Sequence, residues 1–289
     1  MIDNAYTQLI DIEKLLPNLD HPDWVIVDCR FDLTNPEWGF ADYQRAHIPG
    51  AVYADLDHDL AGPRTATSGR HPLPTPEAFC TTMGRLGIGH PKQVIVYDTT
   101  GGSFAARMWW LMKLYGHASV AVLNGGFAAW TGQGLPTETG VHHNAPAYFH
   151  GQPNLRMVVS TEEMEKIVSA GQGKIIDARA PERYRGDVEP IDPIPGHIPG
   201  AINRFHQDNL DSHGYFLPGK ILAAQFKALV GETPTREEIV AYCGSGVTSC
   251  HNLLAMSVAG LPMPRLFAGS WSEWIRDPSR PVARGENPG

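Results

Sequence analysis

The feature of this sequence that most constrains its fold is an internal duplication. Two apolar segments, a His-Ile-Pro-Gly segment and a Gly-rich aromatic segment each occur twice, in the same order. The matched pairs are VIVDCR at 25–30 with IIDAR at 175–179, AHIPGA at 46–51 with GHIPGA at 196–201, VIVYD at 94–98 with IVAYC at 239–243, and GGFAAW at 125–130 with GSWSEW at 269–274. Each copy takes up about half of the 289 residues, so the pattern predicts two similar domains and not a short-period solenoid.

The segment between the two copies has a different composition. Residues 138–154 are rich in His, Pro, Gly and Asn and show no hydrophobic periodicity, which is typical of a linker. We therefore expect one domain over residues 1–137, a linker over 138–154 and a second domain over 155–289.

Within each copy, short apolar runs alternate with amphipathic stretches. Continuous apolar runs are typical of strands buried on both faces of a parallel sheet. The expected strands are 24–28, 94–97, 120–123, 174–177, 238–242 and 265–267, and the expected helices include 104–115, 161–170, 220–230 and 248–259. Ser160 or Thr161 is the expected cap of the third of these helices. The alternation predicts an α/β class in which each domain is an open parallel sheet flanked by helices.

Composition narrows the setting in which the protein works. A net charge of −8 argues against a nucleic-acid partner. The sequence contains no run of 18 or more apolar residues, so no membrane span is expected. The start, Met1 to Asn4, lacks the basic and apolar segments of a secretory leader. Four cysteines are too few for a disulfide scaffold in a chain of this size, so we expect reduced thiols and a cytoplasmic protein.

The residues around Cys243 indicate a reactive thiol. Cys243 follows an expected strand and opens the segment CGSGVTSC at 243–250, which leads into an expected helix. Two glycines in three positions let the backbone curl so that its N–H groups point at one spot, and the helix start adds its positive end. A thiol at that spot ionises readily, and an anion on its sulfur is cradled. Cys29, Cys80 and Cys250 are expected to be small packing residues instead.

Together, the strand–Cys–glycine loop–helix arrangement, the paired His-Ile-Pro-Gly segments and the GSWSEW ending resemble the tandem-domain rhodaneses, which are sulfurtransferases. The resemblance covers nearly the whole chain. It implies two rhodanese-like domains, of which the second is active and carries sulfur as a persulfide on Cys243. The position that matches Cys243 in the first copy is Asp98, which cannot carry sulfane sulfur. The resemblance thus implies that the first domain is a catalytically inactive copy.

The loop also bears on the sulfur donor. Residues 244–249 contain no Lys or Arg, whereas thiosulfate-preferring relatives place basic residues there. The loop resembles that of 3-mercaptopyruvate sulfurtransferases, which implies donor contacts by the loop and by an arginine outside it, for the donor's carboxylate. The implied donor-binding residues are Arg183, Gly244, Gly246, Val247 and Thr248. Where the family often has a second arginine, this chain has Ile191, and Arg179 and Arg185 are candidates to compensate.

The same resemblance implies a proton-handling trio of Ser245, His71 and Asp57. A histidine moves protons near neutral pH, and a carboxylate can fix its tautomer. Sulfur would pass from 3-mercaptopyruvate to a thiol acceptor, such as thioredoxin or a small thiol, or to cyanide. No metal or organic cofactor is expected, and the histidines of the linker have no metal-ligand spacing.

Three other functions stay open. The protein could be a thiosulfate sulfurtransferase, or a persulfide-relay module without a small-molecule donor of its own. A cysteine phosphatase needs a Cys-x5-Arg loop, but the residue six positions after Cys243 is Ser249, so that alternative is weak.

Overall fold

The computed structural model describes residues 5–171 and 173–289. The sequence start, Met1 to Asn4, from which no secretory leader was predicted, lies outside the described residues. The chain forms two compact units. The first contains residues 1–62, 73–154 and 210–216, and the second contains residues 63–72, 155–209 and 217–289. Two short segments thus belong to a different unit from their neighbours in sequence, and the first of them includes His71.

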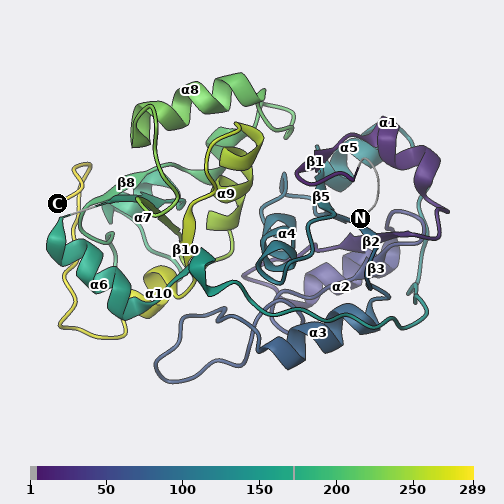
Figure 1. The fold of residues 1–289 in the computed structure, drawn as a ribbon, viewed down its shortest axis with the longest axis horizontal. Coiled ribbons are helices and arrows are strands. Elements are labelled where there is room, and N and C mark those ends of the chain that lie inside the picture. Colours follow the sequence, from purple (N-terminus) through teal and green to yellow (C-terminus); the bar gives the residue numbers. More distant parts are fainter. Residues whose placement is uncertain (1–4, 172) are drawn as a thin grey trace. The chain divides into compact units, whose positions relative to one another are not determined.

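The first unit is an α/β structure around a five-stranded parallel sheet (Figure 1). The strand order is β1-β5-β4-β2-β3, so β4 lies at the centre. The strands are β1 (Leu9–Ile10), β2 (Trp24–Asp28), β3 (Val52–Tyr53), β4 (Gln93–Tyr97) and β5 (Val120–Leu123). The helices are α1 (Ile12–Leu15), α2 (Glu37–Arg45), α3 (Pro76–Arg85), α4 (Ala105–Leu114) and α5 (Gly126–Gly132), with a 3-10 turn at Leu16–Asn18.

The second unit repeats this architecture. Its five parallel strands have the order β6-β10-β9-β7-β8, so β9 takes the central place that β4 has in the first sheet. The strands are β6 (Val158–Val159), β7 (Lys174–Asp177), β8 (Ala201–Asn203), β9 (Ile239–Tyr242) and β10 (Arg265–Phe267). The helices are α6 (Thr161–Ala170), α7 (Pro181–Arg185), α8 (Gly219–Val230), α9 (Ser249–Val258) and α10 (Ser270–Trp274), with 3-10 turns at Leu155–Met157 and His206–Asn209. The predicted α/β class is confirmed.

Each sheet is buried on both faces, as the continuous apolar runs predicted. Successive side chains of a strand point to opposite faces. In the first sheet, Ile26, Ile95 and Leu123 pack with Trp130 of α5 in one apolar cluster. In the second sheet, a corresponding cluster contains Trp271 and Trp274 of α10.

The duplicated His-Ile-Pro-Gly segments have a structural role. In each copy the histidine ring stacks on a tyrosine, with ring centroids 4.1 Å apart for His47 and Tyr43 and 3.9 Å apart for His197 and Tyr184. In each pair, Nδ1 of the histidine also lies within 2.9 Å of the tyrosine's own carbonyl oxygen, which accepts a hydrogen bond. The backbone N–H of the next residue, Ile48 or Ile198, donates to a tyrosine hydroxyl from the central strand. These segments therefore fasten a loop to the sheet.

Predicted boundaries agree closely where periodicity was strong. Helix α6 begins after Ser160, whose hydroxyl accepts a hydrogen bond from the N–H of Glu163, so Ser160 is the cap. The sequence did not predict the short edge strands β1, β3, β6 and β8, nor helices α1, α2, α3, α5, α7 and α10. None of the helices in the described part of the chain is both long and apolar enough to cross a membrane.

Candidate active site

Cys243 lies directly after β9, at the carboxyl end of the central strand of the second sheet. In parallel sheets, ligands bind beyond these strand ends. The loop 243–248 then leads into helix α9, which begins at Ser249. Cys243 is almost fully buried, with 2% of its surface exposed.

The environment of Cys243 favours the thiolate. Burial by itself raises the pKa of the thiol, because it removes water from the charged form. Hydrogen bonds from the Thr248 hydroxyl, from the Ser245 N–H, and from the hydroxyl and N–H of Ser249 act in the opposite direction and lower the pKa below its ordinary value. The donors that lower this pKa come from the loop and from the first residue of α9.

The GSWSEW segment holds the cysteine loop in place. The carbonyl of Cys243 accepts a hydrogen bond from the Trp271 N–H at 3.0 Å, and the carbonyl of Gly244 accepts one from the Ser272 N–H at 2.9 Å. Ser270 Oγ accepts a hydrogen bond from the Cys243 N–H at 3.1 Å. Gly246 has a positive φ of 78°, and a Cβ there would lie 2.4 Å from the Ala268 carbonyl oxygen. A side chain at position 246 would therefore displace the loop.

The first copy contains the same cradle with an anion built into it. Asp98 follows the central strand β4, as Cys243 follows β9. Its Oδ1 accepts hydrogen bonds from the N–H groups of Thr100 and Gly102, and its Oδ2 accepts them from those of Phe104 and Ala105, all within 2.9 Å. The loop geometry thus binds a negative charge. In the first copy the aspartate side chain fills that place permanently.

His71 and Ser245, two of the predicted site residues, are in contact. His71 Nδ1 lies 2.7 Å from Ser245 Oγ, and both residues are buried. His71 belongs to segment 63–72 of the second compact unit. The backbone of this segment is tied to α10, since the Gly69 N–H donates to Glu273 Oε2 and the Arg70 N–H donates to Ser272 Oγ.

The third member of the predicted trio, Asp57, belongs to the first compact unit. Its backbone N–H donates to Asp55 Oδ1 at 2.8 Å. Its role beside His71 stays a prediction.

The guanidinium of Arg183 is held by the carboxylates of Glu189 and Asp192. Its Nε and Nη2 donate to Glu189, and Nη2 also lies 3.3 Å from Asp192 Oδ2. A Cβ built on Gly244 would lie 3.6 and 3.7 Å from Nη2 and Nη1 of Arg183. The guanidinium therefore lies against the cysteine loop.

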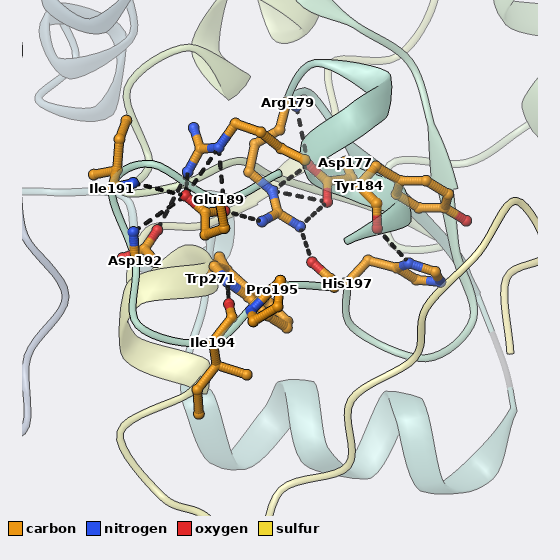
Figure 2. Close-up of polar contacts among 12 residues, drawn as sticks. Asp177, Arg179, Tyr184, Glu189, Ile191, Asp192, Ile194, Pro195, His197 and Trp271 are labelled. Atoms are coloured by element: carbon orange, nitrogen blue, oxygen red, sulfur yellow. Dashed lines mark hydrogen bonds and ion pairs between the residues drawn. The ribbon is translucent and has the colours of Figure 1, made fainter. Parts of the chain in front are cut away.

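Arg179 and Arg185 were the candidates to compensate for the arginine that this chain lacks at position 191. Both pair with residues outside the Cys243 loop. Arg179 is buried and donates to Asp177 and to the Gly196 carbonyl (Figure 2). Arg185 pairs with Asp187. Ile191 is 39% exposed, and its N–H donates a hydrogen bond to Glu189 Oε1.

Other sequence expectations have mixed outcomes. Cys29 and Cys250 are buried packing residues as predicted, but Cys80 is only partly buried, so the prediction of a core position was wrong for it. Helix α3 is amphipathic, and position 80 lies at the edge of its buried face. Among the described residues, no group of His, Cys, Asp or Glu has a geometry suited to a metal ion.

Sequence reasoning missed Arg70, Asp192, Ser249 and Ser270 as residues of this site. Arg70 and Asp192 form an ion pair across more than a hundred positions of the sequence, which no local pattern indicates. The Ser249 and Ser270 hydroxyls act on Cys243 through loop conformations that the sequence does not specify. The available signal was proximity in sequence, since Arg70 directly precedes His71 and Ser249 directly follows the glycine loop.

Comparison with known proteins agrees with this geometry. The family model described as "Rhodanese-like domain" matches twice, at residues 11–133 and 160–277. The chain belongs to the rhodanese family. The first match includes strands β2 to β5 and the second includes β7 to β10, and the predicted pair of rhodanese-like domains is confirmed.

Full-length relatives include proteins named for two different sulfur donors. A Pseudomonas aeruginosa protein named "Probable 3-mercaptopyruvate sulfurtransferase" is 47% identical over 281 residues, covering 96% of this chain and 99% of that protein. The thiosulfate sulfurtransferase of Mus musculus is 32% identical over 257 residues, covering 85% of this chain and 84% of that protein. The crystal structure of SseA from Escherichia coli, described as one of the 3-mercaptopyruvate sulfotransferases, has a TM-score of 0.80 and 31% identity, covering 93% of this chain and all of that one.

Proposed function

We propose that this rhodanese-family protein is a 3-mercaptopyruvate sulfurtransferase that works through a persulfide on Cys243. The observation that carries the proposal is the buried cysteine with a lowered pKa, held among hydroxyl and N–H donors beside the guanidinium of Arg183. A thiolate in this setting is a nucleophile, and the cradle can hold the negative charge of a persulfide after sulfur transfer. The mercaptopyruvate sulfurtransferase names among its relatives support the choice of donor.

The first half-reaction removes sulfur from the donor. The Cys243 thiolate attacks the sulfur of 3-mercaptopyruvate, a sulfur–sulfur bond forms and the carbon–sulfur bond breaks. The electron pair of the broken bond leaves on carbon, as the enolate of pyruvate. The proton from the donor's thiol is then carried to that carbon, which gives pyruvate and leaves Cys243 as a persulfide.

We assign the proton transfer to Ser245 and His71. Their contact of 2.7 Å is short enough for a proton to pass between Oγ and Nδ1, and both groups are shielded from water. Asp57 is the proposed partner that fixes the tautomer of His71. In the donor complex, Arg183 binds the carboxylate, and the loop residues Gly244, Gly246, Val247 and Thr248 surround the transferred sulfur.

The second half-reaction regenerates the thiolate. A thiolate acceptor, thioredoxin-like or small, or cyanide attacks the outer sulfur, and the Cys243 sulfur leaves with the bonding electron pair. We place this reaction in the cytoplasm, where acceptor thiols are reduced. None of these steps needs a metal or an organic cofactor.

The experiment that tests the proposal compares 3-mercaptopyruvate and thiosulfate side by side with the purified protein. We expect a catalytic efficiency at least about tenfold higher with mercaptopyruvate, equal to about 1.4 kcal/mol of transition-state preference. The intact mass should rise by one sulfur atom on the peptide that contains Cys243, and Cys243→Ser should abolish both results.

Two outcomes would assign the protein differently. Equal or reversed efficiencies would make it a thiosulfate sulfurtransferase. Sulfur loading from a protein persulfide, without turnover of either small donor, would make it a relay module.

A further inference from the structure

Helix α10 holds the cysteine loop through its backbone. The Trp271 N–H donates a hydrogen bond to the Cys243 carbonyl at 3.0 Å. The first copy has the matching bond, since the Phe127 N–H donates to the Asp98 carbonyl at 2.8 Å. A backbone bond of this kind needs no particular side chain, so both copies can keep it while their sequences differ.

The side chains of α10 have a separate role in the second copy. They hold segment 63–72, which belongs to the same compact unit and carries the histidine of the proposed proton transfer. Glu273 Oε2 accepts a hydrogen bond from the Gly69 N–H at 3.1 Å, and Ser272 Oγ accepts one from the Arg70 N–H at 3.0 Å. These N–H groups belong to the two residues directly before the histidine. The two side chains of α10 therefore set the point from which the histidine extends.

The other carboxylate oxygen of Glu273 is tied to the body of the domain. Oε1 accepts a hydrogen bond from the hydroxyl of Thr161, the first residue of α6. Both oxygens of this partly buried carboxylate thus have donors, one from α6 and one from segment 63–72. A hydrogen bond to an ionised acceptor is stronger than one between neutral groups. Glu273 therefore fastens the segment to a helix that is already fixed in the fold.

The segment lies close to α10 because Gly69 has no side chain. A Cβ at Gly69 would lie 2.5 Å from the carbonyl oxygen of Gly269 and 3.0 Å from Ser272 Oγ. The first of these is a backbone atom that cannot swing aside. Residues 63–67 are exposed, whereas Gly69 and His71 are buried. The chain therefore leaves solvent and meets the helix at Gly69.

The first copy has neither of the two polar side chains. The segments GSWSEW and GGFAAW align without a gap, which matches Ser272 with Ala128 and Glu273 with Ala129. Ser272 is buried, whereas Ala128 is exposed. The Ser–Glu pair thus occurs in the copy whose loop carries the cysteine, on the side of the helix to which segment 63–72 is bonded.

An exchanged segment does not by itself require this pair. The first unit contains residues 210–216 from the second half of the chain. They are bound at residues ahead of α5, since the Phe216 N–H donates to Asn124 Oδ1 at 2.9 Å and the ring of Tyr215 lies against Gly125. A segment from the other half can therefore be held in other ways, which indicates a specific purpose for the Ser–Glu pair of α10.

We propose that Glu273 is a positioning residue, which together with Ser272 keeps His71 at hydrogen-bond distance from Ser245. His71 Nδ1 lies 2.7 Å from Ser245 Oγ, although the two residues are 174 positions apart. Helix α10 controls both sides of this contact, because its backbone binds the loop of Ser245 and its side chains bind the segment of His71. This inference rests on the proposed function for the role of His71, but the anchoring can be tested without sulfur transfer.

Hydrogen exchange tests the anchoring directly. Amide exchange is followed by mass spectrometry of peptides that span residues 66–74, with fragmentation to separate the Gly69 amide. Glu273→Ala, which introduces the residue of the first copy, should speed exchange at Gly69 by at least about tenfold, as expected for the loss of one hydrogen bond to a charged group. Glu273→Gln keeps an acceptor oxygen and should restore most of the protection.

A double-mutant cycle tests whether the anchoring acts through His71. Glu273→Ala should lower turnover of 3-mercaptopyruvate by about tenfold, and turnover of thiosulfate by less, because sulfite needs no proton on carbon. In the His71→Ala background the same substitution should cause no further loss. A general defect of the site would instead slow both donors and add to the loss from His71→Ala. Alkylation of Cys243 by iodoacetamide should keep its rate, because the backbone bonds of α10 to the loop remain.

Two further variants complete the design. Gly69→Ala moves the segment without changing α10 and should reproduce the effects of Glu273→Ala. Glu163→Ala removes another carboxylate of the first turn of α6, one that pairs with Arg265, and should change neither exchange nor turnover. Unchanged exchange in Glu273→Ala, or a full further loss in the His71→Ala background, would overturn the positioning role. Faster exchange in a protein that does not use mercaptopyruvate would support the anchoring and overturn only the proposed donor.

Discussion

Ser270 holds a backbone conformation that ordinary residues rarely adopt, with a φ of 55°. Gly126 holds the matching position in the first copy with a φ of 58°, where the lack of a Cβ makes this conformation easy. In the second copy the serine hydroxyl accepts a hydrogen bond from the Cys243 N–H and donates one to the Phe267 carbonyl. The cost of the conformation is thus offset by a group that orients the reactive cysteine.

Replacement of Ser270 separates these two contributions. Ser270→Ala keeps the unfavourable φ and loses the hydroxyl, whereas Ser270→Gly loses the hydroxyl but removes the strain. We expect thermal unfolding to rank the proteins serine, glycine, alanine, with the last two about 1 kcal/mol apart. An alanine variant at least as stable as the glycine variant would show that the conformation carries no strain.

His71 is the residue whose substitution should depend on the donor. His71→Ala should lower turnover of 3-mercaptopyruvate by about a hundredfold, the usual contribution of a general acid–base group. Thiosulfate should be affected less, because its sulfite leaving group needs no proton on carbon. His150→Ala, at a histidine of the predicted linker, is the control and should change neither rate. Equal slowing with both donors would remove His71 from proton transfer.

At the scale of elements, the loop and the start of α9 act together on one sulfur. The Thr248 hydroxyl is the largest of the influences that lower the pKa of Cys243, against the opposing effect of burial. Because the folded protein holds this pKa below that of the unfolded chain, the thiolate stabilises the fold at high pH. That contribution is lost as the pH falls through the folded-state pKa.

The pH dependence of alkylation should therefore show the influence of Thr248. With iodoacetamide, the rate at Cys243 should rise with pH and reach half of its maximum below the pKa of an ordinary thiol. Thr248→Val keeps the shape and removes the donor, so the profile should move to higher pH. At neutral pH the rate should fall about fivefold, the contribution of one hydrogen bond. Cys80, which is partly exposed in the first unit, supplies an internal control whose rate should not change. A profile that does not move would mean that the hydroxyl has no effect on the thiolate.

At the scale of the whole molecule, the two copies use one cradle for different purposes. In the second copy the cradle stabilises a reactive sulfur, and in the first it binds the Asp98 carboxylate through four N–H groups. A carboxylate held in this way contributes to folding and not to chemistry. The duplication thus preserves the loop geometry while the function of the residue at the strand end has changed.

Asp98→Asn tests this division. The amide offers one acceptor and turns an N–H₂ group toward donors, so the first unit should lose about 2–3 kcal/mol of stability. Calorimetry should show an unfolding transition at lower temperature, and the alkylation rate of Cys243 in the folded protein should stay the same. Asp32→Asn, at an exposed carboxylate that accepts hydrogen bonds from Thr34, should cost less than about 0.5 kcal/mol. Equal costs at the two positions would contradict a structural role for the Asp98 cradle.

Much of this architecture could be predicted from local patterns. The internal strands Trp24–Asp28 and Lys174–Asp177 were predicted to the residue, and the central strands Gln93–Tyr97 and Ile239–Tyr242 to within one residue, because an apolar run buried on both faces needs no partner to be recognised. The edge strands Leu9–Ile10 and Val52–Tyr53 contain two residues each, too few for any periodicity. They are strands only because a neighbouring strand supplies their hydrogen bonds.

The sequence by itself determined the duplicated α/β fold, the place of Cys243 at the end of a strand and its counterpart Asp98 in the first copy. These depend on apolar periodicity, on glycine placement and on the comparison of one half of the chain with the other. The tertiary structure alone decided which distant residues meet. Arg70 and Asp192 are 122 positions apart, and their charges meet only because segment 63–72 packs within the second compact unit. Ion pairs between distant residues leave no periodic pattern in a sequence, since each partner alone is indistinguishable from a solvated surface charge.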